Sequence, residues 1–205
     1  MTFQPHDLLW LADATKLLSD EIPAWLSTNW HPGLPVVVRR AAATPGHVAI
    51  GIRGSQRSQR LATWASHSGV IQQTTPEQLL TIQVNAARRR CIPALQAFSN
   101  LQRQLTDCAW GPTGNTGFEL ATNKPTLHHG SDLDLLIRCP VAPALHTLRH
   151  WLALFARQPC RVDAQLETPH GGLALLEWAA APRSVMVKTT TGPVLLTDPW
   201  AGQPA

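Results

Sequence analysis

Charged side chains are scarce in this 205-residue sequence, and acids are the scarcer kind. Charged residues make up 15% of the chain and hydrophobic residues 44%, which is typical of a globular protein and excludes a disordered one. The 13 acidic residues are outnumbered by 17 lysines and arginines, for a formal charge of +4. So small an excess is more typical of ordinary surface charge than of a surface built for anions.

Long apolar runs, paired cysteines and a secretory leader are missing too. No run approaches the ~18 apolar residues of a membrane-spanning helix, and the first residues lack the basic region and apolar core of a signal peptide. The four cysteines form no C-x-x-C or C-x-x-H pair, which argues against a structural zinc site. We therefore expect a cytoplasmic protein with reduced, mostly buried thiols and no membrane partner.

Motifs of covalent catalysis and of nucleic-acid binding are absent as well. The sequence contains no G-x-S-x-G elbow and no signature of a paired cysteine and histidine. Its eight tryptophans are dispersed and do not alternate with basic residues, so a nucleic-acid partner is not expected.

The predicted helices and strands divide the chain into two halves and indicate an α+β fold with a mixed sheet. We interpret residues 1–84 as a smaller α/β domain that binds substrate or partner, and residues 85–205 as the catalytic domain. In the first half, we expect helices at 7–18, 23–30 and 61–66 and strands at 36–41 and 47–53. In the second half, we expect helices at 93–105 and 142–157 and strands at 132–138, 160–167, 172–179, 184–189 and 193–198.

Two of the few acids, Asp132 and Asp134, stand inside the apolar stretch SDLDLLI at 131–137. On a strand, residues i and i+2 point to the same face, so these carboxylates would lie side by side. Carboxylates that close repel each other unless a cation lies between them, and Mg²⁺ is held by one or two carboxylates together with substrate phosphates. An isolated D-x-D is more often a solvated sheet edge, whereas on a buried strand it predicts a magnesium site.

Glycines near the two aspartates favour a ligand site over a sheet edge. Gly130 and Ser131 directly precede the pair and would let backbone or hydroxyl groups approach a ligand closely. Upstream, the stretch GPTGNTG contains Gly114 and Gly117, whose backbone N–H groups could form a nest that binds an anion. We therefore predict that these four residues contact the substrate.

The Gly-Ser turn, the strand Ser131-Asp132-Leu133-Asp134-Leu135 and a third acid on a later strand resemble the polymerase-beta-like nucleotidyltransferase superfamily. The resemblance implies that the two aspartates ligate Mg²⁺ ions that bridge a triphosphate during in-line displacement at the α-phosphorus. Asp163 is the candidate for the third catalytic and metal-binding acid, because it leads its strand directly after a predicted helix. Glu167 is the alternative.

A narrower resemblance covers most of the chain. It is carried by PHDLLWL (5–11), IRGSQRSQR (52–60), GFELAT (117–122), SDLDLLI (131–137) and RVDAQLETPHGG (161–172). These stretches are similar to the malonate decarboxylase holo-acyl-carrier-protein synthase family, also called phosphoribosyl-dephospho-CoA transferases. The family transfers 2'-(5-phosphoribosyl)-3'-dephospho-CoA from its triphosphate precursor to a serine of an apo carrier protein and releases pyrophosphate. The resemblance implies Mg²⁺ as cofactor, and triphosphoribosyl-dephospho-CoA and the apo acyl-carrier protein of malonate decarboxylase as partners.

Three arginines, Arg53, Arg57 and Arg60, recur in the stretch GIRGSQRSQR. If this loop leads into a helix, the spacing i, i+4 and i+7 places the three guanidinium groups on one face, where they can meet phosphates. The family resemblance favours a role in binding the substrate or the carrier protein. A solvated basic turn explains the same spacing equally well.

Two other functions remain open from the sequence. One is a generic Mg²⁺-dependent nucleotidyltransferase that uses ATP on a protein or on a small hydroxyl compound. The other is a module without catalytic activity that binds a carrier protein or a CoA derivative. The presence of Asp132, Asp134 and a later acid argues against the module, because a binding protein needs no complete set of metal ligands.

Overall fold

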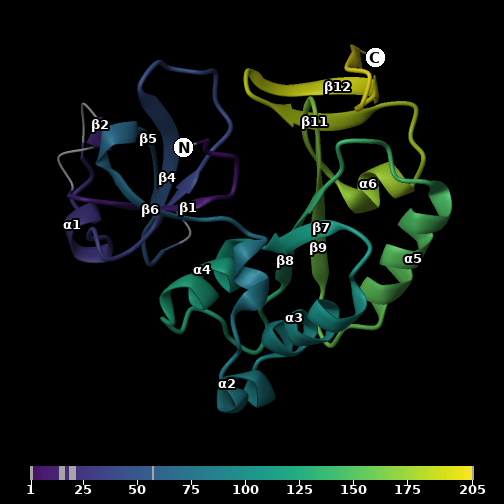
Figure 1. Ribbon diagram of the computed structural model, residues 1–205, viewed down its shortest axis with the longest axis horizontal. Helices are drawn as coiled ribbons and strands as arrows, with labels where there is room; N and C mark the ends of the chain where they lie inside the picture. Colours follow the sequence, from purple (N-terminus) through teal and green to yellow (C-terminus); the bar gives the residue numbers. More distant parts are fainter. Residues whose placement is uncertain (1, 14–16, 19–21, 57, 205) are drawn as a thin grey trace. The chain divides into compact units, whose positions relative to one another are not determined.

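The chain forms two compact units, Met1–Thr75 and Pro76–Ala205, and each has a sheet of its own (Figure 1). The structure is a computed structural model that describes every residue except 1, 14–16, 19–21, 57 and 205. Helices and strands occur in both units, and the second sheet is mixed, so the predicted α+β class with a mixed sheet is confirmed. Among the described residues, no helix is long and apolar enough to cross a membrane.

The first unit is built on an antiparallel sheet, whose strand order within the described residues is β2-β5-β4-β3-β1-β6. Its inward side chains, such as Leu9, Val36 and Ile50, are fully buried. The strands are β1 (Leu8–Leu11), β2 (Leu17–Leu18), β3 (Val36–Val38), β4 (His47–Arg53), β5 (Arg60–Ser66) and β6 (Val70–Thr74). The helices are α1 (Leu26–Asn29) and the 3-10 helix η2 (His67–Gly69).

Two of the three helices predicted in the first half are wrong. The described part of 7–18 forms strands β1 and β2, and residues 61–66 lie in β5. Apolar residues are dense in both stretches, so a helical spacing can be drawn through them as easily as an alternating one. Pairing with partner strands decides the outcome: β5 aligns with the preceding strand β4 along its whole length, from His47 opposite Ser66 to Arg53 opposite Arg60.

The second unit contains a sheet with the order β13-β12-β11-β10-β9-β8-β7. Within the described residues β8 and β9 pair in parallel and the other pairs are antiparallel. The strands are β7 (Ala109–Pro112), β8 (Leu133–Arg138), β9 (Val162–Thr168), β10 (Gly171–Ala174), β11 (Val185–Thr189), β12 (Gly192–Asp198) and β13 (Gln203–Pro204). The helices are η3 (Gln78–Thr81), α2 (Ala86–Cys91), α3 (Pro93–Gln104), α4 (Gly114–Thr122), α5 (Leu145–Ala156) and α6 (Leu175–Ala179).

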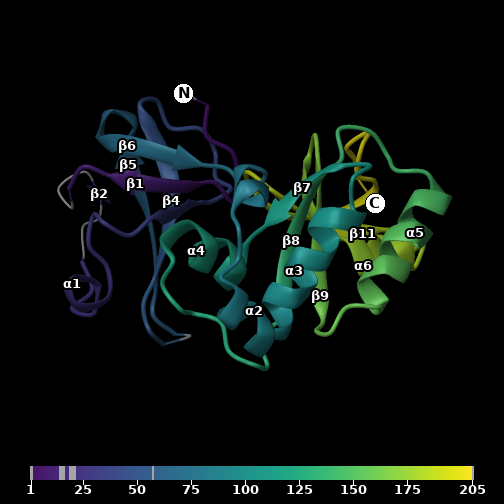
Figure 2. The same cartoon turned by 60° about the horizontal axis from the view of Figure 1, so that its bottom comes forward.

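Helices cover the two faces of the second sheet unequally. Side chains of α3, α5 and α6 form one apolar core with one face of β8 and β9. Helix α4 lies apart from α5 and α6 (Figures 1 and 2), and its Leu120 packs against the edge of the same core. The predicted helices at 93–105 and 142–157 are confirmed as α3 and α5, because their apolar residues recur at helical spacing against this core. The α5 crossover joins β8 to β9, as a parallel pair requires.

One other expectation for the second half needs correction, and the glycine-rich stretch 111–117 takes a defined structure. In that stretch, Gly111 lies in β7, and Gly114 begins α4. The predicted strand 172–179 ends at Ala174, where α6 begins. In both places a strand ends while its partner continues: β8 extends beyond the end of β7, and β9 extends beyond the end of β10.

Residues 76–84, assigned above to the first half, pack with the second unit. Glu77 forms an ion pair with Arg138 at 2.7 Å, and Gln102 of α3 donates to the Leu80 carbonyl at 2.7 Å. Leu79 is only 2% exposed. The chain is therefore divided between residues 75 and 76. The functional roles assigned to the two halves stay predictions.

Candidate active site

Two acids from neighbouring strands lie side by side in the second unit. Asp134 of β8 is directly opposite Asp163 of β9 in their parallel pairing. The residues on either side of them along the strands, such as Leu133, Leu135 and Val162, belong to the apolar core, so both aspartates point to the other face. Because paired strands are about 4.8 Å apart, the two carboxylates can share one ligand.

Asp132 lies one residue before β8 begins and is exposed. Burial raises the pKa of Cys160, two residues before β9 begins, and the nearby charge of Asp132 adds to this rise. The carboxylate therefore lies near the same ends of the two strands as Asp134 and Asp163. Periodicity alone predicted that Asp132 and Asp134 are neighbours on one strand, whereas the structure adds that the closest partner of Asp134 across the sheet is Asp163.

Asp163 already has a cationic neighbour. Arg161 donates from Nε to Asp163 Oδ1 at 2.9 Å, and its Nη2 lies 2.8 Å from the same oxygen. The arginine side chain is 67% exposed, and ion pairs this open to water contribute little free energy. Arg161 can therefore leave Asp163 when a stronger cation or a substrate arrives.

Glu167, the alternative third acid, is further from the pair. It lies four residues along β9 from Asp163, about 13 Å at the rise of a strand, and its register partner is Arg138. Arg138 also holds Glu77. Register thus brings Asp163 to Asp134 and Glu167 to a basic residue at the far end of β8.

The beginning of α4 packs directly against Asp134. Gly114 has a φ of +57°, and a Cβ atom built on it would overlap the Asp134 carboxylate. The backbone N–H of Thr113 donates to the Asp134 carbonyl at 2.9 Å. Only glycine combines that φ with so close an approach, so the residue predicted to contact substrate also brings a helix N-terminus to a candidate acid.

Gly117 lies inside α4 and has a packing role. A Cβ atom there would come within 2.8 Å of the Pro112 carbonyl oxygen and 3.5 Å of Leu79 Cδ1. The glycine lets α4 lie close to the end of β7. Its predicted contact with substrate stays a prediction.

Gly130 and Ser131 form a tight turn before Asp132. Ser131 N donates to the His128 carbonyl at 3.0 Å, and His128 N donates to Ser131 Oγ at 3.1 Å. Gly130 N donates to His128 Nδ1 at 3.2 Å. The Ser131 hydroxyl, 8% exposed, thus holds the turn, and its predicted contact with a ligand stays a prediction.

The three predicted phosphate-binding arginines belong to the first unit. Arg53 and Arg60 are exposed and directly opposite each other at the ends of β4 and β5, and Arg57 lies outside the described residues. The stretch is a β-hairpin closed by Gly54 N donating to the Gln59 carbonyl, so the predicted helical face is wrong. Strand pairing, instead of helical spacing, brings Arg53 and Arg60 together.

The cysteine thiols are poor candidates for a catalytic nucleophile. All four cysteines are free; Cys139 is buried, Cys108 and Cys160 are half-buried and Cys91 is exposed. Burial raises the pKa of Cys108 and of Cys139 to about 12, so both thiols stay protonated at neutral pH. The prediction that most cysteines are buried holds fully only for Cys139.

Carboxylate oxygens are the donors that Mg²⁺ prefers, and a site of one or two carboxylates plus substrate phosphates is typical for it. Asp134 and Asp163 supply two such groups side by side. Among the described residues, no group of three or more His, Cys, Asp or Glu side chains is arranged as a complete metal site. The donor set therefore fits Mg²⁺ that arrives with a phosphate substrate.

An ion pair between α2 and α4 was not predicted from the sequence. Arg88, in the run ARRRC at 87–91, binds Glu119, which is 7% exposed. The signal in the sequence is the single acid of GFELAT within an otherwise uncharged helix.

Family models cover nearly the whole chain. The model described as "Phosphoribosyl-dephospho-CoA transferase MdcG N-terminal domain" matches residues 4–76. The model of the MdcG C-terminal domain matches residues 78–199. Both matched segments coincide closely with the two compact units.

Curated relatives agree with the family models. A phosphoribosyl-dephospho-CoA transferase of Pseudomonas aeruginosa is 44% identical over 96% of this chain and 93% of its own. One of Klebsiella pneumoniae is 41% identical over 97% of both chains, and one of Pseudomonas putida is 42% identical over 97% and 95%. No solved structure matches the chain significantly, so the nucleotidyltransferase superfamily stays a prediction.

Proposed function

Because the chain belongs to the phosphoribosyl-dephospho-CoA transferase family, a family of transferase enzymes, we propose that it attaches the prosthetic group of a malonate decarboxylase. The donor is 2'-(5-triphosphoribosyl)-3'-dephospho-CoA, and the acceptor is a serine of the apo acyl-carrier protein. The observation that carries the proposal is the pairing of Asp134 with Asp163, beside the glycine that begins α4.

In the proposed reaction, the serine oxygen bonds to the α-phosphorus of the triphosphate, and the bond from this phosphorus to the bridging oxygen breaks. Pyrophosphate leaves with the electrons of that bond, and the hydroxyl proton passes to a carboxylate, for which Asp163 is the candidate. The carrier protein supplies the nucleophile, so the enzyme needs neither a serine elbow nor a reactive cysteine.

The chain's own residues would bind and orient the donor. Asp132, Asp134 and Asp163 would hold Mg²⁺, which when bound neutralises the triphosphate and stabilises the charge that develops on it. The N–H groups in the first turn of α4 suit a phosphate oxygen next to Asp134. The arrangement is consistent with a polymerase-beta-like nucleotidyltransferase, which we propose as the superfamily.

The proposal is tested by incubating the pure protein and Mg²⁺ with apo carrier protein and either triphosphoribosyl-dephospho-CoA or ATP. Mass spectrometry of the carrier should show addition of phosphoribosyl-dephospho-CoA with the first donor, and one pyrophosphate should appear per group transferred. Addition of an adenylyl group from ATP alone would instead identify a generic nucleotidyltransferase. No covalent product with either donor would favour a binding module.

We predict that Asp134→Asn and Asp163→Asn each lower kcat about a hundredfold or more, because each removes a charge on which the transition state depends. Asp198→Asn is the matched control: Asp198 lies on β12 of the same sheet, and its Oδ1 accepts from Trp200 N and Ala201 N, which an amide oxygen can also do. Full activity of Asp134→Asn would contradict the proposed metal mechanism.

A further inference from the structure

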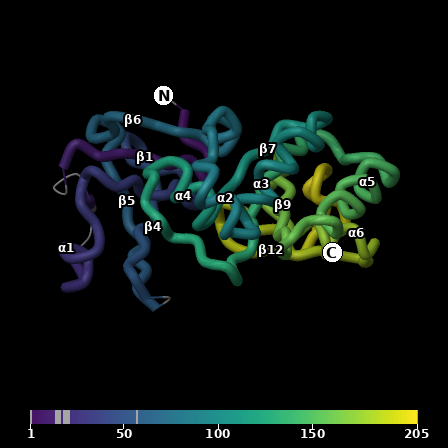
Figure 3. Tube along the Cα trace, turned by 90° about the horizontal axis from the view of Figure 1, so that it is seen from below, coloured from purple at the N-terminus to yellow at the C-terminus, as the bar shows by residue number. Residues whose placement is uncertain are grey.

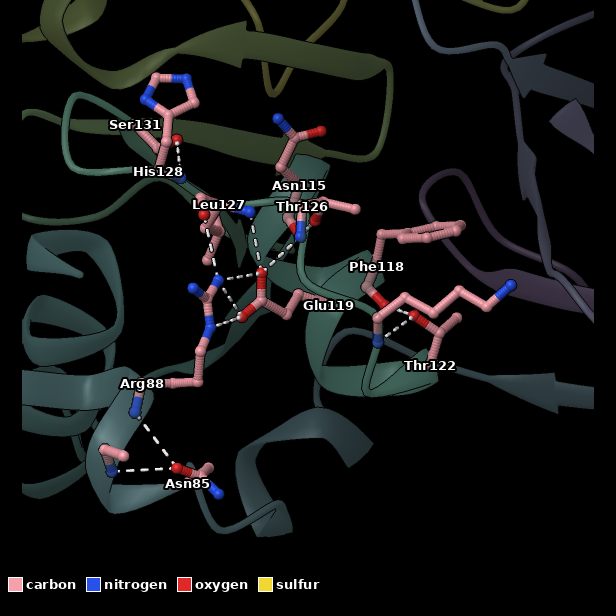
Figure 4. A network of polar contacts seen from close by, with 12 residues as sticks. Asn85, Arg88, Asn115, Phe118, Glu119, Thr122, Thr126, Leu127, His128 and Ser131 are labelled. Atoms are coloured by element: carbon pink, nitrogen blue, oxygen red, sulfur yellow. Dashed lines mark hydrogen bonds and ion pairs between the residues drawn. The ribbon is translucent and has the colours of Figure 1, made fainter. Parts of the chain in front are cut away.

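Glu119 of α4 binds the backbone of the segment that leads to the aspartates. Its Oε2 accepts from Thr126 N at 2.7 Å and from Leu127 N at 2.8 Å (Figure 4). An ionised carboxylate accepts several such bonds without offering a donor of its own. Glu119 therefore holds two consecutive N–H groups of the connection between α4 and β8.

Arg88 of α2 binds both the Glu119 carboxylate and the same backbone segment. It donates from Nε and Nη2 to Glu119 Oε1, at 3.1 Å and 2.8 Å, and from Nη2 to Oε2 at 3.0 Å. The same Nη2 donates to the Leu127 carbonyl at 3.0 Å. The peptide groups on both sides of Leu127 are thus bound by one ion pair, where the connection passes α2 (Figure 3).

The bound segment is continuous with the candidate site. After Leu127 the chain makes the turn closed by Ser131, and Asp132 follows at once. Thr126 Oγ1 also donates to the Asn115 carbonyl at 3.2 Å, next to the glycine that packs on Asp134. Helix α4 therefore touches Asp134 at its first turn and, through Glu119, fixes the path of the chain toward Asp132.

Stability alone is a weak reason for such an ion pair. Removing a carboxylate from water costs free energy that the partner only partly restores, and apolar side chains of similar volume often stabilise as well or better. In some proteins, a buried ion pair instead fixes the relative positions of the groups that it binds. Glu119 faces α2 and the connecting segment and takes no part in the proposed chemistry.

From this geometry we propose that Glu119 and Arg88 are positioning residues: they set Ser131 and Asp132 relative to Asp134, and so determine the affinity of the site for a divalent cation with a polyphosphate. The inference rests on the proposed function, because it takes the aspartates as the metal-binding groups.

The test compares Glu119→Gln with Glu77→Gln. Glu77 also forms an ion pair inside the second unit, and its partner is Arg138 of β8, at 2.7 Å, instead of the segment that leads to Asp132. Binding of Mn²⁺ in the presence of tripolyphosphate is followed by electron paramagnetic resonance. We expect the Kd of Mn²⁺ to rise about tenfold in Glu119→Gln, the size of effect seen for groups that orient metal ligands, and to stay unchanged in Glu77→Gln.

Two further measurements distinguish a positioning role from a general loss of stability of the fold. Hydrogen exchange should accelerate at residues 126–131 in Glu119→Gln only, and kcat should fall at saturating donor and recover in part at high Mg²⁺. Arg88→Lys keeps the charge but loses the forked contact, so it should show the same changes in smaller measure. It also serves as the test if Glu119→Gln does not fold.

The outcomes distinguish this inference from the proposed function. A lower melting temperature with an unchanged Kd for Mn²⁺ in both variants would overturn the positioning role while wild-type transfer remains intact. Failure of the wild-type protein to transfer the group would overturn the proposed function. Loss of Mn²⁺ binding in Asp134→Asn together with the expected Glu119→Gln result would still support the positioning role in that case.

Discussion

At the scale of single residues, the candidate site depends on which acids become neighbours. The D-x-D spacing predicted that Asp132 and Asp134 share a face, a relation of two residues on one chain segment. The neighbour relation of Asp134 and Asp163 arises instead from parallel pairing of β8 with β9, twenty-nine positions apart by number. Sequence reasoning found Asp163 only by its place at the start of a strand.

Gly114 is the residue whose replacement most directly tests the contact between α4 and Asp134. We predict that Gly114→Ala lowers kcat about a hundredfold, because a Cβ atom would displace the Asp134 carboxylate and small displacements of reacting groups have effects of this size. Steady-state transfer assays measure it.

Gly46→Ala is the control for backbone strain. Gly46 has a φ of +72°, but a Cβ atom there meets nothing within 4 Å. This variant should lose about 1 kcal/mol of unfolding free energy and keep its activity. Equal losses of activity in both variants would mean that the left-handed conformation, and not the contact with Asp134, is what matters.

At the scale of helices and strands, local pattern predicted the second unit better than the first. α3 and α5 are long enough for a helical repeat to be unambiguous, and each buries its apolar side against the core. The conformation of β1 and β5 comes instead from hydrogen bonds to partner strands, β6 for β1 and β4 for β5. The basic hairpin that carries Arg53 and Arg60 was misread for the same reason.

The short helix α2 carries Arg88, the partner of Glu119, and its first turn is capped by a side chain. Asn85 caps α2 by accepting from Ala87 N at 2.9 Å and from Arg88 N at 3.2 Å. We predict that Asn85→Ala lowers the free energy of unfolding by about 1 kcal/mol, measured by urea denaturation, while Asn85→Asp retains the cap. A loss as large in Asn85→Asp would show that the cap is not the cause.

At the scale of the whole molecule, the division into two units decides which residues fold together with the candidate site. The second unit has its own apolar core, from Ile92 to Leu196. Residues 76–84 belong to the same unit: Leu80 and Val84 pack against this core, and Glu77 forms an ion pair with Arg138. The predicted division at residue 84 lies just before helix α2, whereas the second compact unit begins at Pro76.

This boundary predicts the stability of fragments. We expect the fragment 76–205 to unfold cooperatively, and the fragment 85–205 to be less stable by about 3 kcal/mol, because removing a buried leucine such as Leu79 alone costs 2–5 kcal/mol. Thermal and urea unfolding of both fragments measure the difference. Equal stability would place the boundary of the folded unit at residue 84.

The sequence by itself determined the α+β class, the long helices, the strand that follows Asp132 and the family to which its motifs point. These depend on periodicity and on short stretches in which the relevant side chains are close along the chain. Only the tertiary structure decided that Asp134 meets Asp163, that Gly114 touches Asp134 and that Arg88 binds Glu119. Such contacts depend on strand register and helix packing between distant segments, which no local pattern encodes.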